Sequence, residues 1–300
     1  MRTGTTTWTA GDIDVETWWR IDGELGAGPA PLVVLHGGPG ATHDYLANLA
    51  ELAARDGRAV VLYDQLGNGR STHLPERGAE FWTVDLFVNE LHTLVRDLGI
   101  ADRHHVLGQS WGGFLAQEYA LTQPPGLRAL VLADTAASFP DFVAECNKLR
   151  AELPADVEAT LRKHEEAGTT DDPDYAAACD VFYRRHVCRL DPWPEFVTAA
   201  FEWIDRDPTV YHTMNGPSEF HVIGSIRDWQ SKDRLGEIRV PTLLVSGRYD
   251  EATPALQETL QAGIADCDWV VFEESAHLPH VEEPERYLDV VGSWLRRYDS

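Results

Sequence analysis

Short apolar runs alternate with helical patterns along most of the chain. Between the runs, hydrophobic residues recur at the spacing of an amphipathic helix in Val84–Leu98, and Pro284–Leu295 opens with a proline suited to a first helical turn. Each run is almost continuously apolar, as expected for a strand buried on both faces. The predicted strands are Leu32–Leu35, Ala59–Tyr63, His105–Leu107, Leu127–Leu132, Thr242–Val245 and Trp269–Phe272. The pattern predicts an α/β fold with a mostly parallel sheet and helices on both faces, and Asp14–Ile21 is expected in an antiparallel edge.

The alternation stops after Ala133 and strands return only at Arg239. The intervening residues are helical in pattern and rich in Trp and Tyr, with candidate helices at Phe142–Leu153, Ala155–Ala167, Asp174–Arg189 and Glu195–Ile204. A helical block inserted between two strands of one parallel sheet lies above the carboxyl edge, where such sheets hold their ligands. We therefore expect residues 1–136 and 233–300 to form the core and residues 137–232 to form a helical cap.

The segment Gly108–Gly113 has the pattern of a tight turn between a strand and a helix. It reads Gly-Gln-Ser-Trp-Gly-Gly, and a stretch of good helix formers follows it. In a G-x-S-x-G turn the glycines remove Cβ atoms that would clash, so that the serine hydroxyl is exposed above the sheet. Because Gly and Ser are common in loops, the pattern alone is not specific. It makes Ser110 a candidate nucleophile.

An acid and a histidine follow this serine in the chain order of an α/β-hydrolase triad. Asp250 comes just after the strand Thr242–Val245, and His277 comes just past the last strand. A lone histidine after a strand is more often a surface residue, but the joint placement of the three groups favours catalysis. His277 is expected to accept the proton of Ser110, and Asp250 to orient and stabilise the imidazolium.

The sequence His36-Gly37-Gly38-Pro39-Gly40 directly follows a predicted strand. Backbone N–H groups in such a turn can face a developing oxyanion without obstruction by side chains. We expect the N–H groups of Gly38 and Trp111 to form the oxyanion hole. The chain contains neither a phosphate-binding glycine loop nor a histidine spacing typical of metal ligands, so we expect no cofactor and no metal.

Composition and charge narrow the range of partners. The 300 residues, 43% of them hydrophobic, are enough for a sizeable core, and 25 Lys plus Arg against 49 Asp plus Glu give a net charge of -24. Such a surface repels phosphate backbones and anionic lipids, so we expect neither nucleic-acid nor membrane binding. Met1–Gly11 is polar and lacks the apolar core of a signal peptide. We expect a cytoplasmic protein with four free cysteines.

Several motifs together make the chain similar to the prolyl aminopeptidase (proline iminopeptidase) family of α/β-hydrolase serine peptidases. They are His36–Gly40, Asp64-Gln65-Leu66-Gly67-Asn68-Gly69-Arg70-Ser71 and Gly108–Gly113. Within the family, the sequence most resembles the tricorn-interacting aminopeptidase and L-amino-acid amidases. That likeness is carried by Asp191-Pro192-Trp193-Pro194, Met214-Asn215-Gly216-Pro217-Ser218-Glu219-Phe220 and Tyr249-Asp250-Glu251-Ala252-Thr253-Pro254.

The resemblance implies a substrate with a free amino terminus. In that family, acidic side chains from the cap and the acid loop hold the amine, and the matching positions here are Glu219 and Glu251. An ammonium group entering a partly dehydrated crevice needs such charge-assisted acceptors. The resemblance thus implies a serine hydrolase that releases an N-terminal proline or small apolar residue from peptides or amino-acid amides through an acyl-enzyme. Candidates for the pocket of the first side chain are Trp111, Phe142, Tyr183 and Trp203.

Other functions stay open at this point. An aminoacylated small metabolite presents the same ammonium and scissile amide as a peptide. A carboxylesterase or lipase would use the same triad and oxyanion hole without needing the paired glutamates. A non-catalytic binding protein would have no reason to keep the triad together with a glycine-rich hole. The sequence leaves the oligomeric state and the pathway open.

Overall fold

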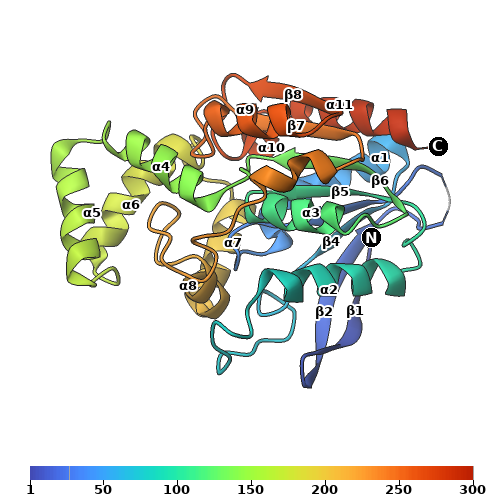
Figure 1. Cartoon of the computed structure of the whole chain (residues 1–300), viewed down its shortest axis with the longest axis horizontal. Coiled ribbons are helices and arrows are strands. Elements are labelled where there is room, and N and C mark those ends of the chain that lie inside the picture. The colour runs from blue at the N-terminus through green and yellow to red at the C-terminus, as the bar shows by residue number, and fades with distance from the viewer. Residues whose placement is uncertain (27, 300) are drawn as a thin grey trace.

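The computed structural model describes residues 1–26 and 28–299 and contains the predicted sheet (Figure 1). Within these residues the sheet has eight strands in the order β1-β2-β4-β3-β5-β6-β7-β8. The first two pair antiparallel with each other, β2 pairs antiparallel with β4, and all other pairs are parallel. The strands are β1 (Arg2–Ala10), β2 (Ile13–Asp22), β3 (Leu32–Leu35), β4 (Val60–Tyr63), β5 (His104–Gln109), β6 (Leu127–Ala133), β7 (Thr242–Gly247) and β8 (Cys267–Phe272).

Helices follow or separate most of these strands. They are α1 (Leu52–Asp56), α2 (Val84–Asp97), α3 (Trp111–Leu121), α4 (Phe139–Arg150), α5 (Ala155–Ala167), α6 (Pro173–His186), α7 (Glu195–Arg206), α8 (Thr209–Met214), α9 (Pro254–Gly263), α10 (Pro279–Glu282) and α11 (Pro284–Leu295). Three 3₁₀ helices are also present within the described chain, namely η1 (His43–Glu51), η2 (Lys232–Glu237) and η3 (Arg296–Tyr298).

Both faces of the sheet are buried, as the continuous apolar runs predict. In β3, Val33 and Leu35 pack into one core with residues of α2, α3 and α9, whereas Leu32 and Val34 pack into a second core with residues of α1 and α11. The alternation follows from the strand geometry, in which successive side chains point to opposite faces. The expected α/β fold with helices on both faces is therefore confirmed.

The outer edge of the sheet is β1, a strand that the apolar pattern does not reveal. Its sequence, RTGTTTWTA, is mostly polar, because an edge strand needs to bury few of its side chains. Thr6 and Ala10 are the buried positions, and the strand pairs along its full length with β2. The expected antiparallel segment Asp14–Ile21 lies within β2, so that part of the prediction is confirmed.

A run of helices from α4 to α8 is inserted between β6 and β7, and α5 and α6 project away from the sheet (Figure 1). Helix α4 begins three residues earlier than expected, because the Ser138 side chain caps it by accepting from the N–H of Asp141 at 3.2 Å. Helix α6 ends at His186 rather than Arg189, and the short helix α8 was not predicted.

The two ends of this insertion meet. Ser138 and Gln230 form an isolated β-bridge, and the N–H of Ser231 donates to the carbonyl of Ala137 at 2.8 Å. Both contacts lie close to the expected limits of the cap. The division into a core of residues 1–136 and 233–300 and a cap of residues 137–232 stays a prediction.

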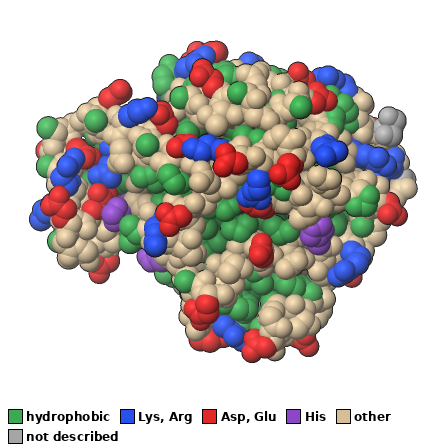
Figure 2. All heavy atoms as spheres, in the orientation of Figure 1, with side chains coloured by type: hydrophobic (Ala, Val, Ile, Leu, Met, Phe, Trp, Pro, Cys, Tyr) green, Lys and Arg blue, Asp and Glu red, His purple; other side chains and the backbone are tan. Residues whose placement is uncertain are grey.

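The surface carries charges of both signs. On the face shown in Figure 2, acidic and basic side chains lie side by side over the sheet region and over the projecting helices. Among the helices of the described residues, none is both long and apolar enough to cross a bilayer.

The turn between β5 and α3 is packed so closely that two of its glycines leave no room for a side chain. A Cβ atom at Gly108 would lie 2.0 Å from the carbonyl oxygen of Gly112, and one at Gly112 would lie 2.2 Å from the carbonyl oxygen of Leu35. These neighbours are backbone atoms and cannot move aside without shifting a strand or a helix.

We expect Gly112→Ala to lower the free energy of unfolding by about 1 to 3 kcal/mol or more, because the added methyl group overpacks the contact between α3 and β3. Urea denaturation followed by tryptophan fluorescence measures the change. The matched control is Gly236→Ala, whose added Cβ has its nearest neighbour at 3.9 Å. Equal midpoints for the two variants would contradict this account of the turn.

Candidate active site

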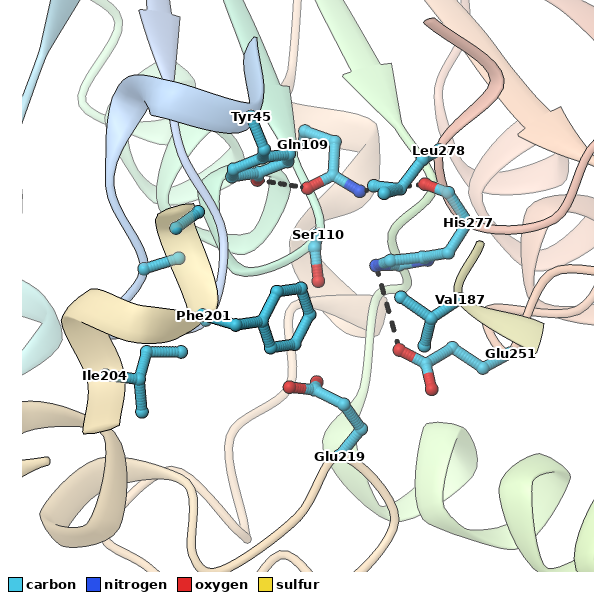
Figure 3. A pocket seen from close by; sticks show the side chains of 13 residues that line it. Tyr45, Gln109, Ser110, Val187, Phe201, Ile204, Glu219, Glu251, His277 and Leu278 are labelled. Atoms are coloured by element: carbon cyan, nitrogen blue, oxygen red, sulfur yellow. Dashed lines mark hydrogen bonds and ion pairs between the residues drawn. The ribbon is translucent and has the colours of Figure 1, made fainter. Parts of the chain in front are cut away.

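Ser110 occupies the turn between β5 and α3 with an unusual backbone conformation. Its φ is 55° and its ψ is -124°, in a region that non-glycine residues rarely adopt. Hydrogen bonds to the next strand hold it: the N–H donates to the Ala133 carbonyl at 2.9 Å, and the Thr135 hydroxyl donates to the Ser110 carbonyl at 2.9 Å. The hydroxyl of Ser110 points into a cavity, as expected from the motif (Figure 3).

His277 lines the same cavity as Ser110, and Asp250 lies against the His277 ring. His277 Nδ1 and Asp250 Oδ1 are 2.6 Å apart, and the same oxygen accepts from the N–H of Ala252 at 2.8 Å. The His277 ring lies next to Ser110 in Figure 3, and both it and Asp250 are buried. Three residues that are 27 or more positions apart in the sequence thus lie close together, and their roles as nucleophile, base and acid stay a prediction.

A buried hydrogen-bond network braces the loops that carry Ser110 and His277. The amide of Gln109 donates through Nε2 to the carbonyl of His277 at 3.0 Å, and its Oε1 accepts from the Tyr45 hydroxyl. The Tyr45 oxygen also accepts from the N–H of Gly37 at 2.7 Å. Tyr45 therefore connects the oxyanion loop with the serine turn. Sequence reasoning missed it, because a tyrosine in an irregular segment gives no indication of its partner.

The residues of the two expected oxyanion donors, Gly38 and Trp111, line the same hollow as Ser110. Gly38 has a φ of 102°, a conformation that favours glycine, and a Cβ there would lie 2.5 Å from the Ala41 nitrogen. Trp111 is the first residue of α3, where the N–H groups of the first turn have no partner within the helix. Neither N–H donates a hydrogen bond to another group in the described part of the chain. Both donors are therefore free for a ligand.

Glu251 lies in the loop between β7 and α9, and Glu219 lies in the segment 137–232. Both side chains line the cavity beside Ser110 (Figure 3). Glu251 is fully buried, and neither carboxylate oxygen has a hydrogen-bond partner among the described residues. Its Oε1 lies 3.7 Å from His277 Nε2. Glu219 accepts a hydrogen bond from the Tyr211 hydroxyl at 2.6 Å, and sequence reasoning did not find Tyr211.

Burial disfavours the charged form of both glutamates. It raises the pKa of Glu219, and it raises the pKa of Glu251 well above the usual range, to which the negative charges of Glu219 and Asp250 add. His277 opposes this effect because its imidazolium stabilises a nearby carboxylate. Glu251 is fully buried and Glu219 is half-buried, and this acidic pair lacks enough positive charge, which is the property expected of a cation-binding site.

Two hollows lie beside Ser110, and both are lined by Gly38 and Glu219. The first is lined by His277 and Glu251 together with apolar side chains, namely Val187, Ala200, Phe201, Ile204 and Leu278. The second is lined by aromatic side chains, namely Trp111, Phe114, Phe139 and Phe142, and by polar residues that include Asp134, Thr135 and Asn215. The surroundings of Ser110 therefore have two regions with apolar walls.

Four aromatic residues are predicted as candidates for the pocket that receives the side chain of the substrate's first residue, and only some of them line a hollow beside Ser110. Trp111 and Phe142 line the second hollow. Tyr183 packs against Phe220 with ring centroids 6.2 Å apart, and Trp203 lies beneath the guanidinium of Arg70 at 5.8 Å. The last two do not line either hollow. Two of the four thus stay candidates.

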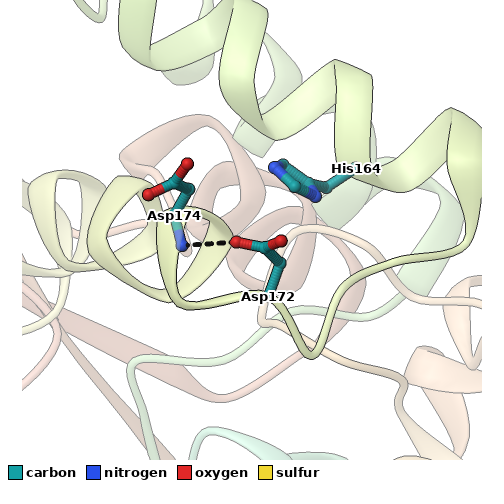
Figure 4. Close-up of side chains that lie close together, drawn as sticks. All are labelled: His164, Asp172 and Asp174. Atoms are coloured by element: carbon teal, nitrogen blue, oxygen red, sulfur yellow. Dashed lines mark hydrogen bonds between the residues drawn. The ribbon is translucent and has the colours of Figure 1, made fainter.

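Among the described residues, His164, Asp172 and Asp174 form a cluster of potential metal ligands near the tip of the projecting helices (Figure 4). Their possible ligand atoms lie within 4.8 Å of one another. Asp172 already caps α6 by accepting from the N–H of Asp174 at 2.9 Å, and His164 Nδ1 lies 2.8 Å from the Thr169 hydroxyl. Three ligands are fewer than the four of a closed zinc site. The hydrogen bonds of Asp172 and His164 show that these side chains already stabilise the turn between α5 and α6.

Comparison with known proteins identifies relatives over nearly the whole chain. The family model for the alpha/beta hydrolase fold matches residues 30–284. The chain is 39% identical over 297 residues to a proline iminopeptidase of Heyndrickxia coagulans, which covers 96% of this chain and 99% of that protein.

Two solved structures are also similar. A proline iminopeptidase of Mycobacterium smegmatis superposes with a TM-score of 0.90 at 46% identity, covering 99% of each chain. The protein VinJ superposes with a TM-score of 0.95 at 50% identity, covering 98% of this chain and 99% of that one. The resemblance found in the motifs is thereby confirmed: the chain belongs to the proline iminopeptidase family of α/β hydrolases and is a hydrolytic enzyme.

Proposed function

We propose that the protein is a serine aminopeptidase or amidase that removes an N-terminal proline or small apolar residue from a peptide or an amino-acid amide. Ser110 is the nucleophile, His277 the general base and acid, and Asp250 the residue that orients the imidazole. The N–H groups of Gly38 and Trp111 form the oxyanion hole, and Glu219 with Glu251 binds the free amine. Residues 137–232 act as a cap over the crevice, because Glu219 and part of the cavity wall come from this segment.

One observation carries the proposal beyond a general hydrolase: the carboxylate of Glu251 is fully buried and has no hydrogen-bond partner among the described residues. A buried polar group without a partner costs free energy, so such a group calls for a functional explanation. A substrate ammonium placed between Glu251 and Glu219 provides charge-assisted hydrogen bonds to both. An esterase acting on uncharged substrates gains nothing from this pair.

The arrangement supports a two-step acyl transfer. Neutral His277 takes the proton of Ser110 as the hydroxyl attacks the scissile carbonyl, and the oxyanion is stabilised by the two backbone N–H groups. The imidazolium then donates its proton to the leaving amine, which leaves an acyl-enzyme. Water attacks this ester with His277 again acting as base, and the free amino acid is released.

The position of the amine site limits cleavage to the first residue. With the ammonium held by the two glutamates and the carbonyl at Ser110, only one residue fits between them. Its side chain enters the second hollow, whose aromatic walls suit proline or another small apolar side chain. The leaving amine lies on the side of the first hollow, next to His277.

Ser110→Ala is expected to abolish labelling by a fluorophosphonate probe, because no acyl-enzyme can form. Turnover of an alanyl or prolyl anilide should fall on the order of 10⁴-fold or more. Mass spectrometry of the labelled wild type locates the modified residue. Labelling of Ser110→Ala at the wild-type rate would remove this serine from the mechanism.

The enzyme is expected to need a free, protonated α-amine. N-acetylation of an aminoacyl anilide leaves the carboxylates of Glu219 and Glu251 without their cation, a mismatch of about 2 to 5 kcal/mol, so kcat/KM should fall roughly 30-fold to several thousand-fold. In Glu251→Gln this preference for the free amine should shrink, while turnover of a small uncharged ester is largely kept.

The matched control is Glu258→Gln, which removes an exposed carboxylate of α9. It should keep the wild-type preference for the free amine. Equal hydrolysis of free and acetylated substrates by the wild type would refute the aminopeptidase function and favour an esterase.

The pH dependence should reveal the negative charge around His277. Burial disfavours its imidazolium, but the carboxylates of Asp250, Glu251 and Glu219 outweigh this effect and raise the pKa of His277 to about 9. Since the neutral ring is the base, activity falls as the pH drops below this value. Glu251→Gln removes a negative charge, destabilises the imidazolium and should move the acid limb of kcat/KM about one pH unit lower. The assay uses an uncharged ester, because this substrate has no titratable group of its own. An acid limb that stays in place or moves to higher pH in Glu251→Gln would contradict the proposed contact between Glu251 and His277.

A further inference from the structure

Asp134 is a second buried carboxyl group beside the proposed triad acid. It directly follows β6, whereas Asp250 follows the neighbouring strand β7. The side chain of Asp134 is fully buried, and its Oδ1 accepts a hydrogen bond from the N–H of Gly247 at 3.2 Å. The Oδ2 atoms of Asp134 and Asp250 are both buried without a hydrogen-bond donor among the described residues. The two carboxyl groups lie within hydrogen-bond reach of each other.

Two adjacent carboxyl groups in a buried site do not both ionise, because each negative charge disfavours the other. Burial and the neighbouring Asp250 raise the pKa of Asp134 well above its usual range. Asp250 is the better place for the charge, because its Oδ1 receives two N–H groups, from His277 and from Ala252. Asp134 receives only the single, longer bond from Gly247. The shared proton therefore belongs on Asp134.

We propose that Asp134 is a positioning residue that stays protonated and donates its hydroxyl to Oδ2 of Asp250, so that Oδ1 of Asp250 faces His277. The inference rests on the proposed role of Asp250 in catalysis. A single proton between the two Oδ2 atoms satisfies both of the oxygens that otherwise lack a partner. The bond also withdraws negative charge from Asp250, which keeps His277 from becoming still more basic.

The backbone of Asp134 supports a special role for this side chain. Its φ is 51°, in the left-handed region that non-glycine residues seldom adopt. Its N–H donates to the carbonyl of Val245 at 2.9 Å, which fixes this conformation against β7. A glycine would adopt the same backbone without strain, yet it would leave Oδ2 of Asp250 without a donor.

Other titratable groups face Asp134 from the surrounding elements. They are Glu282 of α10, the hydroxyl of Tyr287 on α11 and the hydroxyl of Tyr45 on η1. Glu282 is occupied by the N–H groups of Ala276 and Arg189. Asp250 is thus the carboxyl group that shares a hydrogen bond with Asp134, and the other groups act on it only through space.

The decisive experiment compares Asp134→Asn with Asp134→Ala by following kcat/KM for an uncharged ester against pH. Asn keeps an N–H donor toward Asp250 and has the same charge as a protonated Asp. We expect the acid limb of Asp134→Asn to stay at the wild-type position. Asp134→Ala removes the donor, so its kcat/KM should fall about 10-fold to 100-fold and its acid limb should move to higher pH.

If Asp134 is instead ionised, Asp134→Asn removes a negative charge, and its acid limb moves lower by about one unit, which would overturn the proposal. An unmoved rate and acid limb in Asp134→Ala would overturn it as well. The surface variant Asp266→Asn controls for the loss of a distant charge. Thermal unfolding checks the fold of each variant, and Asp134→Asn decides the question alone if Asp134→Ala does not fold.

Infrared difference spectroscopy gives a readout that does not depend on turnover. The wild-type spectrum minus the Asp134→Asn spectrum should contain the band of a protonated, buried carboxyl group. Buried carboxyl groups that both proteins share, Glu251 among them, cancel in this difference. Absence of the band from the difference would contradict the assignment of the proton to Asp134. Retained ester turnover in His277→Ala would refute the proposed triad itself, and this outcome is separate from any result on Asp134.

Discussion

The charge balance around His277 is the constraint on which the rest of the site depends. Asp250, Glu251 and Glu219 all act on this imidazole in a region shielded from water. In a low-dielectric environment, each additional carboxylate without a cation or a donor costs several kcal/mol. The fold tolerates the surplus because every one of these groups has a partner or leaves a place for one. His277 neutralises Asp250, Tyr211 supports Glu219, and the carboxylate of Glu251, which has no hydrogen-bond partner among the described residues, is the proposed place for an incoming cation.

In the proposed mechanism, this balance couples substrate binding to catalysis. In the free enzyme His277 is the cation nearest to Glu251, with 3.7 Å between the ring nitrogen and the carboxylate. An ammonium that binds between the glutamates replaces the imidazolium as their counter-charge and so lowers the affinity of His277 for its proton. The neutral base needed for attack by Ser110 then forms where the substrate is bound. The amine site would act on the chemistry as well as on specificity.

Rigid backbone contacts bring the partners of this balance together. Gln109 holds the His277 loop to the serine turn, and its oxygen is bound by Tyr45. The cap contributes as well, since the carbonyl of Val187 accepts from the N–H of His277 at 3.1 Å and that of His186 accepts from the N–H of Glu251 at 3.2 Å. The end of α6 therefore positions the acid and histidine loops directly. Movement of the end of α6 would therefore shift the loops that carry Glu251 and His277.

The sequence by itself determined the elements that depend on local chemistry. The apolar runs predict the buried strands because both faces of a parallel sheet exclude water, and the glycines around Ser110 predict the turn because no side chain fits there. Chain order at the carboxyl ends of strands was enough to name Asp250 and His277, and likeness to a family was needed to name Glu219 and Glu251. The threonine-rich β1 was missed because an edge strand buries too few side chains to show an apolar pattern.

Only the tertiary structure decided which polar side chains contact one another. Tyr45 and Asp134 lie far in sequence from Gln109 and Asp250, and no spacing rule connects Asp134 with Asp250 across 116 positions. Tyr211 is only eight positions from Glu219, but no pattern in the sequence shows that the chain after α8 brings the two side chains together. The proximity of Asp134 and Asp250 arises from the order of β6 and β7 in the sheet. In our proposal, burial turns an ordinary aspartate after a strand into a group that shares a proton. That change depends on three-dimensional packing, which the local sequence does not encode.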